Sequence, residues 1–481
     1  MMSRGHGATV LLAGMAATLG FAPFFLWPVG VASIAYLWWL VREAASPRQA
    51  ALAALVWGMG HQLTALYWLP RAFYLDADRS VMAAIAGGIP ALVVIALYGA
   101  LAVVLVAWSA RSVPVSARPG VFVVGWVALE VIKSLHPMGF PWLPVGAMWG
   151  GSLPLLQTAS VVGVHGISVL LVTLAVLVTS WQPWRWRVVA AMVLVAYAGG
   201  VMRLQDAPAD DEDGATIRLV QPNIQSAHKW NPELRMQYLR ETLATAYAPG
   251  SQRAEAIFMP EAAVAFYLQE EPSIRQLSAS GLYGQQALVT GSVRRAGEGS
   301  AMQFFNGLTV LYPDATLGDW YDKQLLVPFG EYIPLRSVLD ALPLPAPIRV
   351  LSQSRLDFTH GTVSPLLTTP VGHALGLICY EGIFPYHVLR HARGADYLLN
   401  ITNDNWFTGT TALAQHATLE RLRAVETGLP LVRVANTGLT MLVDGYGRIR
   451  HQLPPNQAGY LDVPLPPSQV PTFLARWMHA L

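Results

Sequence analysis

The chain has few charged residues and a single cysteine, and it lacks the signatures of metal and cofactor proteins. Asp, Glu, Lys and Arg make up 12% of it, about half the share typical of soluble domains. One cysteine, Cys379, excludes an internal disulfide, so the fold must depend on its own core. No two of the twelve histidines have metal-ligand spacing, and no P-loop or glycine-rich dinucleotide motif is present. We therefore expect no metal and no cofactor, and the net charge of +2 is too small to indicate a nucleic-acid partner.

The few charges are unevenly distributed along the chain. Residues 1–203 hold 15 of the 60 charged residues, although they make up over two-fifths of the length. A helical membrane span needs about 20 mainly apolar residues, and this part contains seven apolar runs: 8–22, 24–41, 50–69, 81–109, 121–132, 153–181 and 188–202. We predict a transmembrane helical domain of about seven spans over 1–205 and a linker over 206–215.

Basic residues at the ends of the runs predict the orientation of this domain. With a cytoplasmic N-terminus, the cytoplasmic segments hold seven of them: Arg4, Arg42, Arg48, Arg111, Arg118, Arg185 and Arg187. The opposite segments hold three: Arg71, Arg79 and Lys133. Basic residues are enriched on the cytoplasmic side of membrane proteins. An odd number of spans then places the rest of the chain outside the cytoplasm.

The second part of the chain reads as a soluble α/β domain over 216–465. Short apolar runs predict strands within 216–224, 256–264, 287–293, 307–313, 373–382, 396–404 and 431–438, with helices over 233–247 and 413–427. Alternating strands and helices are typical of layered α/β domains. Polar residues follow several of these strands, namely Asn223, Glu261, Cys379 and Asn403. Since chemistry in open α/β sheets collects at the carboxyl ends of strands, we expect one catalytic edge.

Glu261, Lys323 and Cys379 are the candidate catalytic residues. A lone cysteine is most often a small buried apolar residue, but a thiol, a carboxylate and an ammonium together also make up a nucleophilic acyl-transfer site. In that site the thiolate attacks, and Glu261 takes the thiol proton and returns it to the leaving group. Lys323 holds Glu261 ionised and, with the backbone N–H after Cys379, stabilises the tetrahedral oxyanion.

The residues around these three resemble known motifs. MPEAA (259–263), YDKQLLVPFGEYIP (321–334) and LGLICYEGIFP (375–385) are similar to the Glu, Lys and Cys motifs of the carbon–nitrogen hydrolase (nitrilase) superfamily. Joined to a multi-span part, they resemble the apolipoprotein N-acyltransferase family. Six further segments resemble motifs of the same family: FAPFFLWP (21–28), GFPWLPVG (139–146), GVHGIS (163–168), VQPNIQSAHKW (220–230), NDNWF (403–407) and RAVETGLPLVRVANTG (423–438).

The resemblance implies a fold, a reaction and a set of roles. The fold would be an α-β-β-α nitrilase-like sandwich on a helical membrane domain. Glu261 would be the general base, Lys323 the oxyanion-side lysine and Cys379 the nucleophile. Supporting roles are implied for Trp230, Glu331, Tyr380 and Glu381.

In this family an acyl chain passes from a phospholipid to the cysteine as a thioester. It then passes to the α-amine of the diacylglyceryl-cysteine of an apolipoprotein. The implied partners are therefore a phospholipid donor, diacylglyceryl-modified apolipoproteins and the bilayer. The implied location is the bacterial inner membrane, with the catalytic domain on the periplasmic side.

Two other functions are compatible with the same residues. One is a membrane-anchored amidase or nitrilase with the same triad and water as the acceptor, and the other is a catalytically silent scaffold that binds lipoproteins. The intact triad argues against the scaffold. Three features favour the acyltransferase: the aromatic loop 136–146, the seven-span base and the aliphatic segment 335–361. We expect the segment 335–361 to act as a mobile arm over the site.

The chain departs from the family pattern at Asn405, Thr408 and Leu429, and at its C-terminal end. The family usually has one more transmembrane helix, whereas here only residues 466–481 follow the last strand. Residues 471–481 would form a helix of about 16 Å, half the thickness of the hydrocarbon core. Because Phe473, Leu474, Trp477, Met478 and Leu481 share one face, we expect this helix to lie in the membrane interface.

Overall fold

The computed structural model describes residues 4–74, 88–135, 139–180, 182–208, 214–224, 231–328, 330–334, 336 and 357–480. The chain divides into two compact units, and each is described by itself. The first unit takes in residues 1–73, 84–207 and 414–422, and the second takes in 74–83, 208–413 and 423–481.

The first unit is helical, and each of the seven predicted apolar runs overlaps one of its longer helices. These are α1 (Arg4–Ala17), α2 (Trp27–Glu43), α3 (Pro47–Ala65), α6 (Ile89–Ser112), α7 (Arg118–Lys133), α9 (Ala159–Val178) and α10 (Pro183–Gln205). Among the helices in the described residues, α6, α9 and α10 are long and apolar enough to cross a membrane. Glycines let α3 approach its neighbours closely, as is common in membrane helices. A Cβ on Gly58 would lie 2.9 Å from the Cα atom of Ala100 in α6.

The second unit contains two six-stranded sheets in its described residues. The first has the order β12-β1-β2-β3-β4-β5 and consists of β1 (Thr216–Gln221), β2 (Ala256–Phe258), β3 (Ala287–Ala296), β4 (Gln303–Leu311), β5 (Leu317–Asp322) and β12 (Gly459–Pro464). The second has the order β11-β10-β9-β8-β7-β6 and consists of β6 (Leu366–Thr369), β7 (Gly372–Ile378), β8 (Tyr397–Thr402), β9 (Leu431–Ala435), β10 (Thr440–Val443) and β11 (Ile449–Leu453).

The strand directions explain why the polar residues after the strands can meet. In the first sheet β1, β2 and β3 run parallel, and in the second β7, β8 and β9 run parallel. The carboxyl ends of parallel neighbours share one edge of a sheet. All seven strands predicted from the sequence are present, whereas β5, β6, β10, β11 and β12 were not among the predicted ranges.

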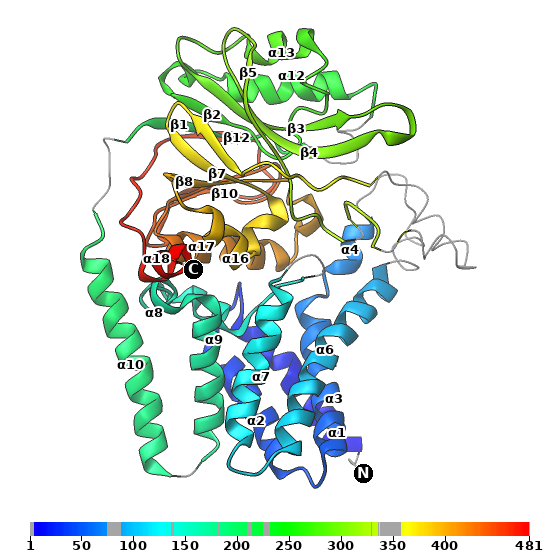
Figure 1. Ribbon diagram of the computed structural model, residues 1–481, viewed down its shortest axis with the longest axis vertical. Coiled ribbons are helices and arrows are strands. Elements are labelled where there is room, and N and C mark those ends of the chain that lie inside the picture. The colour runs from blue at the N-terminus through cyan, green and yellow to red at the C-terminus, as the bar shows by residue number, and fades with distance from the viewer. Residues whose placement is uncertain are drawn as a thin grey trace. The chain divides into compact units, whose positions relative to one another are not determined.

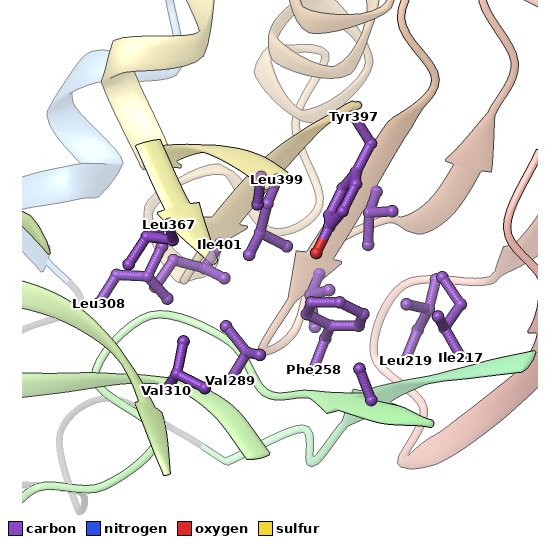
Figure 2. Close-up of a cluster of buried hydrophobic side chains, with 14 of the residues drawn as sticks. Ile217, Leu219, Phe258, Val289, Leu308, Val310, Leu367, Tyr397, Leu399 and Ile401 are labelled. Carbon is purple, nitrogen blue, oxygen red and sulfur yellow. The ribbon is translucent and has the colours of Figure 1, made fainter. Parts of the chain in front are cut away.

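The two sheets pack face to face around an apolar core (Figure 2). Side chains from β1 to β4 meet side chains from β6 to β10. Phe258 of the first sheet and Tyr397 of the second make an edge-on ring contact at 6.1 Å between centroids. This is the sheet-on-sheet packing of a sandwich.

Helices cover the outer faces of the sandwich. α12 (Arg235–Ala246) and α13 (Pro272–Ala279) place Leu239, Leu243 and Ile274 against the outer side chains of the first sheet. α16 (Pro385–His391) and the C-terminal part of α17 (Ala412–Thr427) lie beside the second sheet (Figure 1). The predicted α-β-β-α architecture is confirmed.

The predicted C-terminal helix is present as α18 (Phe473–Ala480), but its apolar side chains do not all face away from the domain. Leu474, Ala475 and Met478 pack against Leu389 of α16. Two of the residues that share the predicted apolar face, Leu474 and Met478, therefore have apolar partners on their own domain, and Leu481 lies outside the described residues. Phe473 and Trp477 are 59% and 55% exposed, and their position in a membrane interface stays a prediction.

Candidate functional site

Cys379 lies at the carboxyl end of the buried strand β7, as the apolar run before it predicted. Its φ angle is +52°, a left-handed conformation that is uncommon for a residue with a side chain. A short 3₁₀ helix (Cys379–Ile383) follows directly. The side chain of Asn400 in β8 donates a 3.0 Å hydrogen bond to the carbonyl oxygen of Cys379. The strained turn is thus held by the neighbouring strand, and strain of this kind is typical of functional sites.

Glu261 follows β2 after two residues and lies on a tightly packed turn. Gly291 of β3 makes room for it, because a Cβ there would lie 2.8 Å from the Cα atom of Glu261. One carboxylate oxygen accepts a 2.7 Å hydrogen bond from the side chain of Asn306. The other accepts a 3.0 Å hydrogen bond from the backbone N–H of Asn403. Both bonds orient the carboxylate.

Lys323 directly follows β5 and is almost completely buried. Its ammonium nitrogen lies 2.9 Å from the carboxylate of Glu331 and 3.9 Å from that of Glu261. Burial alone would lower the pKa of Lys323, but Glu331 and then Glu261 raise it, and the net result is a pKa above its usual value. Lys323 is therefore a permanent cation, as an oxyanion-stabilising group requires.

Glu331 lies closer to the Lys323 ammonium than Glu261 does. The sequence predicted only Glu261 as the partner of this lysine. The carboxylate of Glu331 also accepts hydrogen bonds from the side chain of Asn306 at 3.0 Å and the backbone N–H of Val327 at 2.8 Å. Asn306 therefore joins both carboxylates. It was not predicted, since a single amide within the apolar strand β4 carries no recognisable motif.

Glu381 lies two residues after Cys379 and is fully buried. It accepts hydrogen bonds from the Tyr321 hydroxyl and from the backbone N–H groups of Gln324, Leu325 and Ile378. Burial raises its pKa, while Lys323 and the donors act in the opposite direction. The carboxylate thereby ties the segment after Lys323 to the strand end before Cys379, which makes it a positioning group.

Of the two remaining predicted residues, Tyr380 and Trp230, the structure describes only Tyr380. Tyr380 packs its ring edge-on against Phe384, 4.9 Å away between centroids, and is 7% exposed. Trp230 lies outside the described residues. Most of the predicted arm over 335–361 also lies outside them. Its described end is tied to the site, because the backbone N–H of Gly361 donates to the carbonyl oxygen of Lys323 at 2.8 Å.

The surroundings of Cys379 favour the protonated thiol in the free protein. Burial raises its pKa first, and Glu261 and Asp404 raise it further. Lys323 and a hydrogen bond with Thr402 lower it, and the net result is a pKa well above the usual thiol value. A nucleophilic attack by this thiol therefore needs a base that removes the proton as the attack proceeds.

The geometry brings a thiol, a carboxylate and an ammonium together at the ends of β7, β2 and β5. Across the part of the chain that the structure describes, no group of three or more His, Cys, Asp or Glu side chains could hold a metal ion. The parts are those of covalent acyl transfer through a cysteine.

Comparison with known proteins gives consistent matches over almost the whole chain. Residues 13–177 match the apolipoprotein N-acyltransferase N-terminal domain, and residues 216–472 match the carbon-nitrogen hydrolase family. An apolipoprotein N-acyltransferase of Brucella melitensis is 33% identical over 96% of this chain and 90% of its own length. Those of Rhizobium meliloti and Bradyrhizobium diazoefficiens are each 34% identical, over 96% and 97% of this chain and 90% of their own lengths.

Proposed function

The chain belongs to the apolipoprotein N-acyltransferase family, and we propose that it transfers a phospholipid acyl chain to an apolipoprotein through a thioester on Cys379. As a member of this family it is an N-acyltransferase with a carbon–nitrogen hydrolase domain. The proposal concerns the donor, the covalent carrier and the roles of the individual residues.

In the first half-reaction Glu261 accepts the proton of the Cys379 thiol as the sulfur attacks the ester carbonyl of the phospholipid. The negative charge on the tetrahedral oxygen is stabilised by Lys323 and by the backbone N–H of Tyr380. The carbon–oxygen ester bond then breaks. The leaving lysophospholipid oxygen takes the proton back from Glu261.

In the second half-reaction the neutral α-amine of a diacylglyceryl-cysteine attacks the thioester carbonyl. Glu261 accepts a proton from the attacking nitrogen, and Lys323 again faces the oxyanion. The carbon–sulfur bond breaks, the proton passes to the sulfur of Cys379, and the amide product leaves. A thioester suits this step because a thiolate is a better leaving group than an alkoxide.

One observation carries this assignment, namely the charge arrangement around the thiol. Glu261 and Lys323 lie 3.9 Å apart, and both affect the pKa of Cys379, Glu261 upward and Lys323 downward. A carboxylate next to a thiol with a raised pKa can accept the thiol proton during the attack. A cysteine with a purely structural role would need neither the carboxylate of Glu261 nor the ammonium of Lys323.

We further propose that residues 1–205 form the membrane domain, 206–215 a linker, 216–465 the catalytic domain and 466–481 an interfacial segment. The catalytic domain would face the periplasm. Its partners would be phospholipids of the bilayer and diacylglyceryl-modified apolipoproteins. The excess of basic residues on the other side of the predicted spans supports this orientation.

Mass spectrometry of the purified protein after incubation with phospholipid vesicles tests the carrier. We expect the mass of one acyl chain on the peptide that contains Cys379, and its loss when a diacylglyceryl-cysteine peptide is added. Cys379→Ala should remain folded and unacylated. Transfer by this variant at the wild-type rate would refute the mechanism. Release of free fatty acid at an equal rate with and without the peptide would favour the hydrolase alternative.

A further inference from the structure

The turn that follows β8, at Asn403 and Asp404, is joined to β9 by a buried ion pair close to the catalytic residues. Asp404 has a φ angle of +51°, and both Asp404 and its partner Arg433 in β9 are completely buried. The guanidinium of Arg433 contacts both carboxylate oxygens of Asp404, at 2.7 and 3.1 Å. It also donates to the carbonyl oxygen of Leu439 at 2.7 Å. A two-point contact fixes orientation as well as distance.

Further contacts hold the same turn from other sides. The hydroxyl of Thr402 donates to Asp404 at 3.0 Å, and the side chain of Asn436 donates to that of Asn403 at 2.7 Å. Gly438 lies against the Asp404 carboxylate so closely that a Cβ there would be 2.0 Å from an oxygen. The turn therefore has little freedom to move while the ion pair is intact.

This turn affects two catalytic groups at once. The backbone N–H of Asn403 donates to the carboxylate of Glu261 at 3.0 Å. The negative charge of Asp404 lies near enough to Cys379 to disfavour its thiolate. A shift of the turn would thus misplace the base, and an uncompensated Asp404 would oppose formation of the nucleophile.

We propose that Arg433 is a positioning residue of the acyl-transfer reaction, which fixes Asp404 and thereby holds the Asn403 N–H on Glu261. The inference rests on the proposed roles of Glu261 and Cys379. Buried ion pairs are weak evidence for stability, because their desolvation offsets much of their attraction. A gain in site geometry accounts better for this pair than a gain in stability does.

Two substitutions separate the charge from the geometry. In Asp404→Asn the negative charge disappears while Arg433 stays charged, because a guanidinium does not lose its proton in proteins. The thiolate then becomes more favourable, so the pKa of Cys379 falls. Arg433→Lys keeps the positive charge but loses the two-point contact, so the turn loosens while the local charge stays the same.

The readout of the charge is alkylation of the protein by iodoacetamide as a function of pH. Because the chain has one cysteine, every alkylated thiol reports Cys379. The charged groups that bear on it are Glu261 after β2, Lys323 after β5 and Asp404 after β8. We expect the midpoint for Asp404→Asn to fall by about one pH unit, the size of a single-charge effect at an effective dielectric near 20. For Arg433→Lys we expect the wild-type midpoint.

The readout of the geometry is the rate of acyl-enzyme formation on phospholipid vesicles. We expect Arg433→Lys to slow it about 10- to 100-fold, as misplacement of a catalytic group does. Arg218→Lys is the matched control, since Arg218 is also fully buried and makes a two-point contact with Asp462 at the edge of the first sheet. It should change neither readout.

The outcomes decide the inference separately from the proposed function. Wild-type acylation in Arg433→Lys overturns the role of Arg433, and a wild-type alkylation midpoint in Asp404→Asn overturns the charge effect of Asp404 on Cys379. If Asp404→Asn does not fold, the acylation rate of Arg433→Lys against the Arg218→Lys control decides alone. Failure of the proposed function would appear elsewhere, as transfer by Cys379→Ala, and the alkylation profiles would still test the charge effect.

Discussion

The hydroxyl of Tyr321 donates a 2.6 Å hydrogen bond to the carboxylate of Glu381, sixty residues further along the chain. Tyr321 belongs to β5, which ends just before Lys323, and Glu381 lies two residues after Cys379. The bond therefore joins the first sheet to the second close to Lys323 and Cys379 in the sequence. In the proposed mechanism Glu381 would act through this link, since its oxygens accept hydrogen bonds from Tyr321 and from backbone donors.

Tyr321→Phe should lower the stability of the protein and slow acylation. A buried carboxylate that loses one donor costs about 1–3 kcal/mol of unfolding free energy, and the segment with Lys323 becomes less well fixed. Tyr397→Phe is the control, because the Tyr397 hydroxyl also makes a buried hydrogen bond, to Thr369. Tyr397 is the first residue of β8 and so lies at the end of that strand away from the catalytic edge. Thermal unfolding should be affected similarly in both variants, and the acylation burst only in Tyr321→Phe. Equal bursts would contradict a positioning role for this link.

Glu261→Gln should make the thiol more reactive toward iodoacetamide while abolishing acyl transfer. The negative charge of Glu261 raises the pKa of Cys379, so removing the charge lowers that pKa, and the alkylation midpoint moves to lower pH. Acylation is lost because no base remains to carry the proton. Parallel alkylation and acyl-enzyme assays check the opposite signs. Glu270→Gln, at an exposed pair with Arg295, should alter neither. A normal acyl-enzyme burst in Glu261→Gln would disprove its role as base.

Lys323→Met should act on the thiol in the opposite direction. The ammonium lowers the pKa of Cys379, so its removal raises that pKa, and alkylation at a fixed pH below the midpoint becomes slower. Acyl-enzyme formation should fall by about 10²–10³, the usual cost of losing one oxyanion donor. Lys323→Arg keeps the charge and should retain the wild-type alkylation profile. If Lys323→Met alkylates faster than the wild type, the assigned electrostatics are wrong.

The sequence alone could predict the site residues that closely follow a strand, because a short apolar run marks each strand end. The apolar run Leu375–Ile378 before a single cysteine predicted both β7 and the position of Cys379, and the polar residues after β2 and β8 predicted the shared edge. Each of these depends on a few consecutive residues, which the sequence displays directly.

Asn306 and Arg433 could not be found in this way, because their roles depend on pairing between distant segments. Asn306 lies within β4, and the register that pairs Gly307 with Asp322 is what brings it beside Lys323. The guanidinium of Arg433 meets Asp404 only because β9 lies next to β8. An amide or an arginine within an apolar strand reads locally as an isolated polar residue.

The remaining prediction concerns the side of the membrane on which the chemistry takes place. α10 is 23 residues long, about 34 Å at 1.5 Å per residue, which is enough to cross the hydrocarbon core. Arg185 and Arg187 lie in its first turns, so its N-terminal end should be cytoplasmic. The catalytic domain after α10 is then extracytoplasmic. An alkaline phosphatase that is active only outside the cytoplasm, fused after Gly214, should be active. The same reporter fused after Val115, between Arg111 and Arg118, should be inactive. Activity after Val115 together with inactivity after Gly214 would reverse the topology, and it would place the acylation of Cys379 on the cytoplasmic leaflet.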